Sequence, residues 1–302
     1  MPADFPKVSI ITINFNGTAV TAELLQSLEK ITYPDIEVVV VDNSTKTPGH
    51  ELSIRFPWIK YLETGENRGF AGGNNQGIEL ATGDYIFLLN NDTEVAPDFL
   101  EPLVARMQSD TTIGVVCPKI LYFDEPDTIQ FAGFLPINPI TGRGFSIGYL
   151  EKDKGQYNEA RPTSRAHGAA MMFSRAAMEK VGLMAELFFL YYEEMDYCER
   201  FKRAGYTIWY EPKSKIWHKE SISTGKGSTL KTYYYGRNRL LYLRRNTFGF
   251  QRVLMYLYYF IIAVPKNLLG YLIKGDTAHL KAFWQGLAWN FSNGSADIHD
   301  KK

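Results

Sequence analysis

Apolar runs and helical patterns alternate along the first 120 residues of the chain. Continuous stretches rich in β-branched and other apolar residues predict strands that are buried on both faces. Such stretches lie at 8–14, 36–42, 85–89 and 113–120, with a shorter one at 58–63, and segments with helical spacing of apolar residues lie at 18–30, 69–81 and 97–109. Strands that alternate with helices predict an α/β fold, in which helices cover both faces of a mainly parallel sheet.

The pattern changes after this region. Residues 124–165 are rich in glycine, proline and asparagine and predict long loops or a small hairpin, and loops of this length are often functional in a compact domain. The next predicted elements are a strand at 169–174, a charged helix at 194–204 and strands at 207–210 and 215–217. From about residue 230 tyrosine, leucine, arginine and phenylalanine dominate. We therefore predict a main domain of residues 1–230 and a helical tail of residues 231–302.

Charge divides between these two parts. The 302 residues include 33 basic and 33 acidic side chains, but residues 1–230 hold 22 basic and 30 acidic ones, and residues 231–302 hold 11 and 3. The zero net charge argues against a general nucleic-acid binder. A basic and aromatic tail is typical of a helix that lies on an anionic membrane surface.

The tail contains an apolar stretch at 253–273. Pro265, Lys266 and Asn267 interrupt it after twelve residues, which are too few to cross a bilayer. We expect an amphipathic helix in the membrane interface, with a buried helix of a soluble protein as the alternative. The only cysteines, Cys117 and Cys198, are too few for a disulfide framework, and no apolar stretch precedes the first strand. Both features predict a cytoplasmic protein without a signal peptide.

Polar residues follow three of the predicted strands. They are Asn14 and Asn16, then Asp42, then Asn90, Asn91 and Asp92. Ligands of open α/β sheets bind at the carboxyl ends of the strands, where these residues would gather. Asp92 is a candidate ligand for a divalent cation that bridges a diphosphate, and an ordinary turn is the alternative. His218, which also follows a predicted strand, is a candidate second ligand.

Two other segments suggest a site. The glycine-rich segment 65–75 opens a helix, where the backbone can approach an anion, but it lacks the G-x-G-x-x-G spacing of dinucleotide-binding proteins. Glu193, Glu194 and Asp196 begin the charged helix directly after an aromatic run. Acidic residues suit the start of a helix, yet an acid beside such a run can also have a raised pKa and act as a general base.

Several segments, in this order, resemble a known family. They are VSIITINFNG (8–17), VVVVDNS (38–44), ENRGFAGGNNQGI (66–78), GDYIFLLNNDTEV (83–95), PKILYFDEPDTIQFAG (118–133), HGAAMMFSRAAMEKVG (167–182), FFLYYEEMDYCERFKRAGY (188–206) and IWHKESIS (216–223). Over about residues 7–240 the chain resembles the family 2 glycosyltransferases with the GT-A fold, and it is most similar to their bacterial rhamnosyltransferase-like branch.

The resemblance implies an activity and its partners. A sugar, which we expect to be L-rhamnose, would pass with inversion from a nucleotide-diphosphate donor such as a dTDP- or UDP-sugar. The acceptor would be a hydroxyl of a glycan or of a polyprenyl-diphosphate-linked glycan, in cell-surface polysaccharide synthesis. The enzyme would then lie on the inner face of the plasma membrane.

The resemblance also implies roles for individual residues. The donor would meet Asn14, Asn16, Asp42, Asn67, Arg68, Asn74, Asn90 and Asn91. Asp92 and His218 would hold Mg²⁺ or Mn²⁺. Glu194 stands where the family usually has an aspartate base, and Glu193 and Asp196 are the alternatives. His167, Arg237 and Arg239 would meet the acceptor or its lipid phosphates.

Two other functions remain possible at this stage. A nucleotidyltransferase has a related sheet and a metal-held nucleotide, but its first loop would be richer in glycine and lysine than residues 14–17. A non-catalytic nucleotide-sugar-binding protein would keep Asp92 and His218 without needing a base. Measured hydrolysis or transfer of a nucleotide sugar separates these functions.

Overall fold

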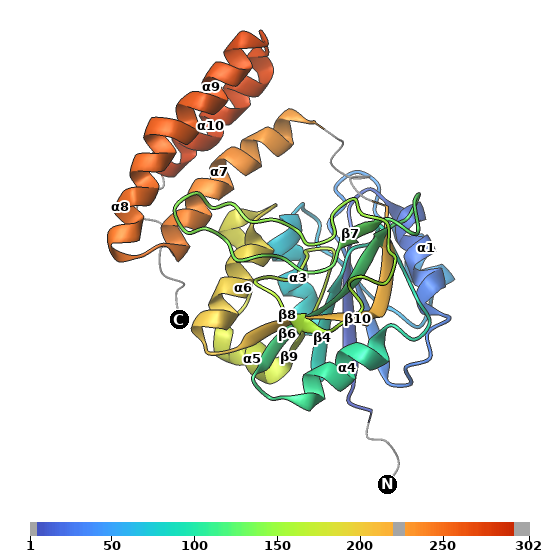
Figure 1. Cartoon of the computed structure of the whole chain (residues 1–302). Coiled ribbons are helices and arrows are strands. Elements are labelled where there is room, and N and C mark those ends of the chain that lie inside the picture. The colour runs from blue at the N-terminus through green and yellow to red at the C-terminus, as the bar shows by residue number, and fades with distance from the viewer. Residues whose placement is uncertain (1–4, 220–226, 293–302) are drawn as a thin grey trace.

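The computed structural model describes residues 5–219 and 227–292 of the chain. Figure 1 shows a domain built around one twisted sheet, with a group of long helices beside it that belongs to the C-terminal part. The last residues of the predicted tail, 293–302, and the end of the family-like segment at 216–223 lie outside the described residues. So do residues 1–4, on which the prediction of no signal peptide partly rests.

The strands form a single sheet in the order β3-β2-β1-β4-β9-β6-β10-β5, with β7 paired to β6 and β8 paired to β10. Their bounds are β1 Val8–Asn14, β2 Ile36–Asp42, β3 Lys60–Glu63, β4 Tyr85–Leu89, β5 Thr93–Val95, β6 Ile113–Tyr122, β7 Ile129–Phe131, β8 Arg161–Pro162, β9 Ala170–Ser174 and β10 Thr207–His218. The apolar stretches that predicted strands therefore do form the centre of the sheet, and the α/β fold is confirmed.

Helices cover the sheet and continue beyond it. In the main domain they are α1 Thr18–Leu28, α2 Glu51–Arg55, α3 Gly69–Leu80, α4 Leu100–Ser109, α5 Arg175–Val181, the 3₁₀ helix η1 Glu186–Phe188 and α6 Glu193–Arg203. The tail contains α7 Thr229–Asn246, α8 Gly249–Tyr258, the π-helical turn η2 Tyr259–Ala263, α9 Val264–Ile273 and α10 Thr277–Ser292. The first tail helix thus begins close to the predicted change at residue 230.

The sheet is mixed rather than mainly parallel. β1 runs parallel to β2 and β4, as predicted, but β9 is antiparallel to both β4 and β6. The segment between β6 and β9 contains no helix. A parallel return would need a crossover connection, which is usually a helix, whereas an irregular connection permits an antiparallel return. This same segment, predicted as long loops or a small hairpin, also adds the short strands β7 and β8 to the sheet.

The apolar stretch of the tail forms one continuous helical run from Gly249 to Ile273. Pro265, Lys266 and Asn267, which interrupt the apolar residues of the sequence, lie within this helical run. The π-helical turn η2 ends two residues before Pro265, and such a turn relieves the clash between a proline ring and the carbonyl four residues earlier in the helix. Asn267 adds a hydrogen bond from its side-chain amide to the Ala263 carbonyl (2.6 Å). By length and composition alone, this run of 25 residues, which contains an 18-residue window with a mean hydropathy of 1.4, is long and apolar enough to cross a membrane.

Candidate active site

The polar residues after β1 and β2 lie side by side because the two strands are parallel and pair Asn14 with Asp42. Asp42 is fully buried and accepts hydrogen bonds from Ser44, Gly49 and the Tyr61 hydroxyl. Burial opposes its ionisation, but these bonds prevail and hold the pKa of Asp42 below its usual value. Asn14 accepts from the Thr21 hydroxyl (2.9 Å).

Neither Asn14 nor Asp42 lines the cavity at the end of the sheet, and Asn16 does not line it either. Their side chains instead accept hydrogen bonds from the loops that follow β1 and β2, Asn14 from Gly17 and Asp42 from Gly49.

This cavity, which we call the strand-end pocket, has a volume of about 390 Å³. The predicted site residues that line it are Asn67, Asn74, Asn90, Asn91, Asp92, His167, Glu193, Glu194 and His218. Arg68 is not among the lining residues and forms an ion pair with Glu66 (2.9 Å). The structure therefore gathers most of the predicted residues from strands β4 and β10 and from the starts of α3 and α6.

Asp92 and His218 meet inside this pocket although 126 positions separate them in the chain. The antiparallel pairing of β5 with β10 places His218 opposite Thr93 and so brings the two side chains together. Asp92 Oδ1 lies 3.1 Å from His218 Nε2, and both residues are buried. His218 Nδ1 lies 2.7 Å from the amide oxygen of Gln130, which can only accept, so Nδ1 carries a proton.

This geometry fits a shared divalent cation. With Nδ1 donating to Gln130, Nε2 of His218 is the ring nitrogen that faces the Asp92 carboxylate, where it can donate a proton to the carboxylate or bind a cation together with it. Two ligands at right angles on a cation with bonds of ~2.1 Å are about 3.0 Å apart, close to the observed separation. Among the described residues no group of three or more histidine, cysteine or acidic side chains converges on one point. A cation here would therefore need oxygens from a bound ligand or water to complete its coordination.

The acidic residues of α6 occupy three different environments. Glu194 borders the strand-end pocket, and its Oε1 accepts from Arg165 Nη1 (2.9 Å). Glu193 is buried, and its Oε2 has no hydrogen-bond partner. Burial, followed by the negative charge of Glu194, raises the pKa of Glu193 well above its usual value. Of Glu193 and Glu194, Glu193 is therefore the less suited to be the ionised carboxylate that acts as a base.

Asp196, the third acid, does not line the pocket. It is fully buried in an ion pair with Arg245 of α7 (2.9 Å) and also accepts from Asn246. Its predicted role as an alternative base is corrected to a structural one, because a partnered and enclosed carboxylate cannot reach a substrate.

A profile of the family described as glycosyl transferase family 2 matches residues 9–182, which is more than half of the chain. The chain belongs to this family. The predicted GT-A fold and glycosyltransferase activity are confirmed.

Relatives and solved structures agree with this assignment. The low-salt glycan biosynthesis hexosyltransferase Agl10 of Haloferax volcanii is 29% identical over 78% of this glycosyltransferase and 74% of its own length. The N-acetylglucosaminyl-diphospho-decaprenol L-rhamnosyltransferase of Mycobacterium tuberculosis is 21% identical over 80% of this chain and 86% of its own length. GalNAc-T7, solved with UDP, GalNAc and Mn²⁺, superimposes with a TM-score of 0.67 at 17% identity, over 99% of this chain and 59% of that one. The mannosyltransferase PcManGT of Pyrobaculum calidifontis, solved with GDP-Man and Mn²⁺, superimposes with a TM-score of 0.58 at 20% identity, over 98% of this chain and 78% of that one.

The loop that leads into the acidic helix of the glycosyltransferase is strained. Phe189, Tyr191 and Tyr192 have φ angles of 63°, 68° and 75°, in the left-handed region that bulky residues avoid. Such conformations cost roughly 1 kcal/mol or more each and persist only when surrounding contacts enforce them. One contact is at Gly69, where an added Cβ would lie 2.3 Å from the Phe189 carbonyl oxygen. Only glycine permits the backbone of α3 to approach this loop so closely.

Helix α7 supplies the other contacts to this loop. Asn238 is fully buried, and its side-chain amide donates to the carbonyls of Phe188, Leu190 and Tyr191 at 2.7–2.9 Å. Arg237 donates to the Phe188 carbonyl (2.5 Å) and is also buried. The predicted contact of Arg237 with lipid phosphates is therefore corrected, since its guanidinium faces backbone carbonyls inside the protein. The tail thus holds the loop that presents Glu193 and Glu194.

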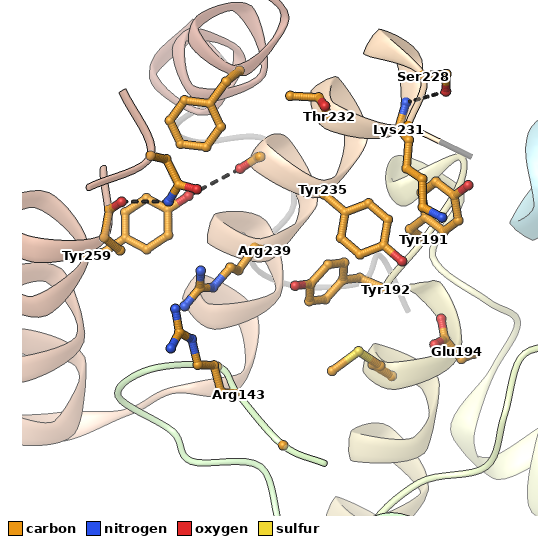
Figure 2. A pocket seen from close by; sticks show the side chains of 18 of the residues that line it. Arg143, Tyr191, Tyr192, Glu194, Ser228, Lys231, Thr232, Tyr235, Arg239 and Tyr259 are labelled. Atoms are coloured by element: carbon orange, nitrogen blue, oxygen red, sulfur yellow. Dashed lines mark hydrogen bonds between the residues drawn. The ribbon is translucent and has the colours of Figure 1, made fainter. Parts of the chain in front are cut away.

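A second cavity of about 500 Å³, which we call the tail pocket, opens between the main domain and the tail helices. Figure 2 shows it with residues from the 124–165 segment, α6 and α7 around it. Five residues line both cavities: Arg165, Tyr191, Glu194, Lys231 and Tyr235. The Glu194 carboxylate therefore stands where the two pockets adjoin.

Several site residues were not predicted. Gln130, Arg165, Lys231 and Tyr235 line the pockets, and Asn238 holds the loop. For Arg165 and Gln130 the signal was available, because both belong to the glycine- and proline-rich segment whose length suggested function. Nothing in the local pattern distinguishes Asn238 from other polar residues of the tail.

Proposed function

We propose that this glycosyltransferase binds a nucleotide-diphosphate sugar in the strand-end pocket and transfers the sugar, with inversion, to an acceptor hydroxyl that enters from the tail pocket. The observation that carries this proposal is the position of Glu194 on the wall that the two pockets share. A base must reach the acceptor hydroxyl as it attacks the anomeric carbon, so it belongs at the boundary of the donor and acceptor sites.

The proposed reaction is a single displacement. The acceptor oxygen forms a bond to the anomeric carbon, the bond from that carbon to the diphosphate oxygen breaks, and the nucleoside diphosphate leaves with the electron pair. Glu194 takes the proton of the acceptor hydroxyl, while Arg165 holds its carboxylate in place (2.9 Å). Asn238, through the strained loop, fixes where α6 begins.

We propose that Asp92 and His218 hold a divalent cation, Mg²⁺ or Mn²⁺, together with the donor diphosphate. When bound, the cation would neutralise charge on the diphosphate. The 3.1 Å separation of the two side chains supports this assignment, and the solved structures of PcManGT and GalNAc-T7 contain Mn²⁺. The name of the Mycobacterium relative supports L-rhamnose as the sugar and a diphosphate-linked lipid as the acceptor.

A panel of nucleotide sugars tests the proposed activity. With Mn²⁺ and no acceptor, we expect slow release of nucleoside diphosphate from one donor class, at a rate at least about tenfold above the others, because water can replace the acceptor hydroxyl at Glu194. Excess EDTA should abolish this release. A chain that neither hydrolyses nor is thermally stabilised by any dTDP-, UDP- or GDP-sugar would contradict the proposed function.

We also propose that the helix run Gly249–Ile273 rests on a membrane, which would place the enzyme peripherally on the inner face of the plasma membrane. Large apolar side chains along it are exposed, among them Phe250 (74%), Ile261 (67%) and Ile273 (84%). Lys266, Lys274 and Lys281 are exposed in the same region, whereas Arg237, Arg244 and Arg245 are buried. Attraction to an anionic surface would thus depend on these lysines and not on the buried arginines.

The membrane proposal predicts a loss of vesicle binding. The triple variant Phe250→Glu, Ile261→Glu, Ile273→Glu should leave anionic phospholipid vesicles in a flotation assay, since each change removes apolar contact and adds a repelled charge. Ile54→Glu, at a similarly exposed residue of α2 (80%), is the matched control and should float as the wild type does. Equal flotation of the triple variant would overturn the proposal.

A further inference from the structure

The tail pocket has an excess of positive charge. Its charged lining residues are Arg143, Arg165, Lys231 and Arg239, against the single acid Glu194. Glu194 already pairs with Arg165. Three cations therefore face the pocket without an acidic partner in its lining, which is the electrostatic pattern of a site for an anion.

Two of these cations come from different parts of the chain and are directed toward one another. Figure 2 shows the guanidinium groups of Arg143 and Arg239 pointing toward one another across the pocket, the first from the 124–165 segment and the second from α7. Arg239 is fixed by a hydrogen bond from Nη2 to the Thr141 carbonyl (2.5 Å). The exposed Arg143 side chain has no hydrogen bond or ion pair to any described residue. An anion between two such groups would offset their mutual repulsion, and guanidinium groups match phosphate oxygens in pairs.

Another part of the pocket lining is aromatic and also belongs to the tail helices. Tyr259, Tyr271 and Phe283 line it, and Arg239 lies 5.9 Å from the centre of the Tyr259 ring. Tyr259 and Ala263 of η2 face the pocket, whereas Ile261 and Ile262 of the same turn are exposed. One helical turn thus connects the cationic pocket with the apolar outer surface of the tail. A ligand that is anionic at one end and an apolar chain at the other matches this arrangement.

We propose that Arg143 and Arg239 bind the diphosphate of a prenyl-linked acceptor, with the aromatic wall against the first isoprenoid units of its chain. This inference rests on the proposed function, because it assigns the acceptor side of the same reaction. It places the acceptor sugar between the arginine pair and Glu194, so that the diphosphate positions the attacking hydroxyl at the base.

Farnesyl diphosphate serves as the probe, and its dissociation constant is measured by calorimetry on the full chain. Mn²⁺ and a saturating concentration of the nucleoside diphosphate released in the donor assay are present, so that the strand-end pocket is occupied. Arg143→Gln and Arg239→Gln should each weaken binding by about tenfold to a hundredfold, the loss expected when hydrogen bonds to a charged group are removed. Arg55→Gln, at an exposed arginine of α2, is the matched control and should bind as the wild type does. Because Arg143 is exposed and without a described partner, its variant keeps the test valid if Arg239→Gln folds poorly.

Three comparisons identify the source of the bound phosphate. Inorganic pyrophosphate and farnesol should each bind at least about tenfold more weakly than farnesyl diphosphate, since each lacks half of the proposed contacts. Equal affinity for pyrophosphate, unchanged affinity in both arginine variants, or displacement of the probe by anionic phospholipid vesicles would overturn the proposal. Donor hydrolysis by the wild type is measured in parallel. Its persistence alongside a failed farnesyl diphosphate test would refute only the acceptor assignment.

Discussion

Glu194→Gln is expected to lower kcat for sugar transfer by about 10²–10⁴-fold, the contribution typical of a positioned general base. Glutamine keeps the size and one oxygen of the side chain but cannot take the acceptor proton. Its amide oxygen can still accept from Arg165, so the fold and the donor KM should change little. The measurement is steady-state transfer with saturating donor, together with a melting curve for each variant.

Two further variants make this result specific. Glu194→Asp restores a carboxylate of the kind that the family usually carries here, so it should recover much of the lost activity. Glu159→Gln, at an exposed glutamate of the 124–165 segment, should match the wild type. If Glu194→Gln transferred sugar at the wild-type rate while Glu193→Gln did not, the base would be Glu193, and its raised pKa would need to be offset in the bound complex.

Predicting the fold from the sequence worked where the determinants are local. The strands β1, β2 and β4 are buried on both faces, so their apolar runs are continuous and visible in the sequence. The direction of β9 depends on pairing with β4 and β6, which no local pattern records. The π-helical turn before Pro265 was not predicted either, because such a turn has no sequence signature of its own.

The candidate site shows the same division. Asp92 was recognised because it follows an apolar strand, but its meeting with His218 requires the non-local pairing of β5 and β10. The arginines of the tail were assigned to a membrane because a charged side chain is normally exposed. Arg237 is instead buried against the carbonyls of a strained loop, and such carbonyls become available only in the folded chain. Residues whose partners are backbone atoms of a distant loop are therefore the hardest to assign from sequence.

Asp92→Asn is expected to lower kcat/KM for the donor by about 10²-fold or more, because several kcal/mol of charge stabilisation depend on the proposed cation. Asparagine keeps the shape of the side chain but removes the negative charge that faces His218 Nε2 at 3.1 Å. The apparent affinity for Mn²⁺ in the presence of nucleoside diphosphate should fall in parallel, which calorimetry measures without turnover. His218→Ala should produce a loss of the same kind, since both side chains contact the same cation in this proposal.

The distinction between a cation ligand and a structural residue lies in how the variants respond to metal. Added Mn²⁺ should stabilise the wild type against heat only together with nucleoside diphosphate, because the described protein residues offer two ligands and the diphosphate must supply others. Asp92→Asn should lose this joint stabilisation while its melting temperature without ligands stays near that of the wild type. Asp35→Asn, at an exposed aspartate beside the opposite end of β2, is the matched control. Joint stabilisation that survives in both Asp92→Asn and His218→Ala would place the cation elsewhere and leave this buried pair with a structural role.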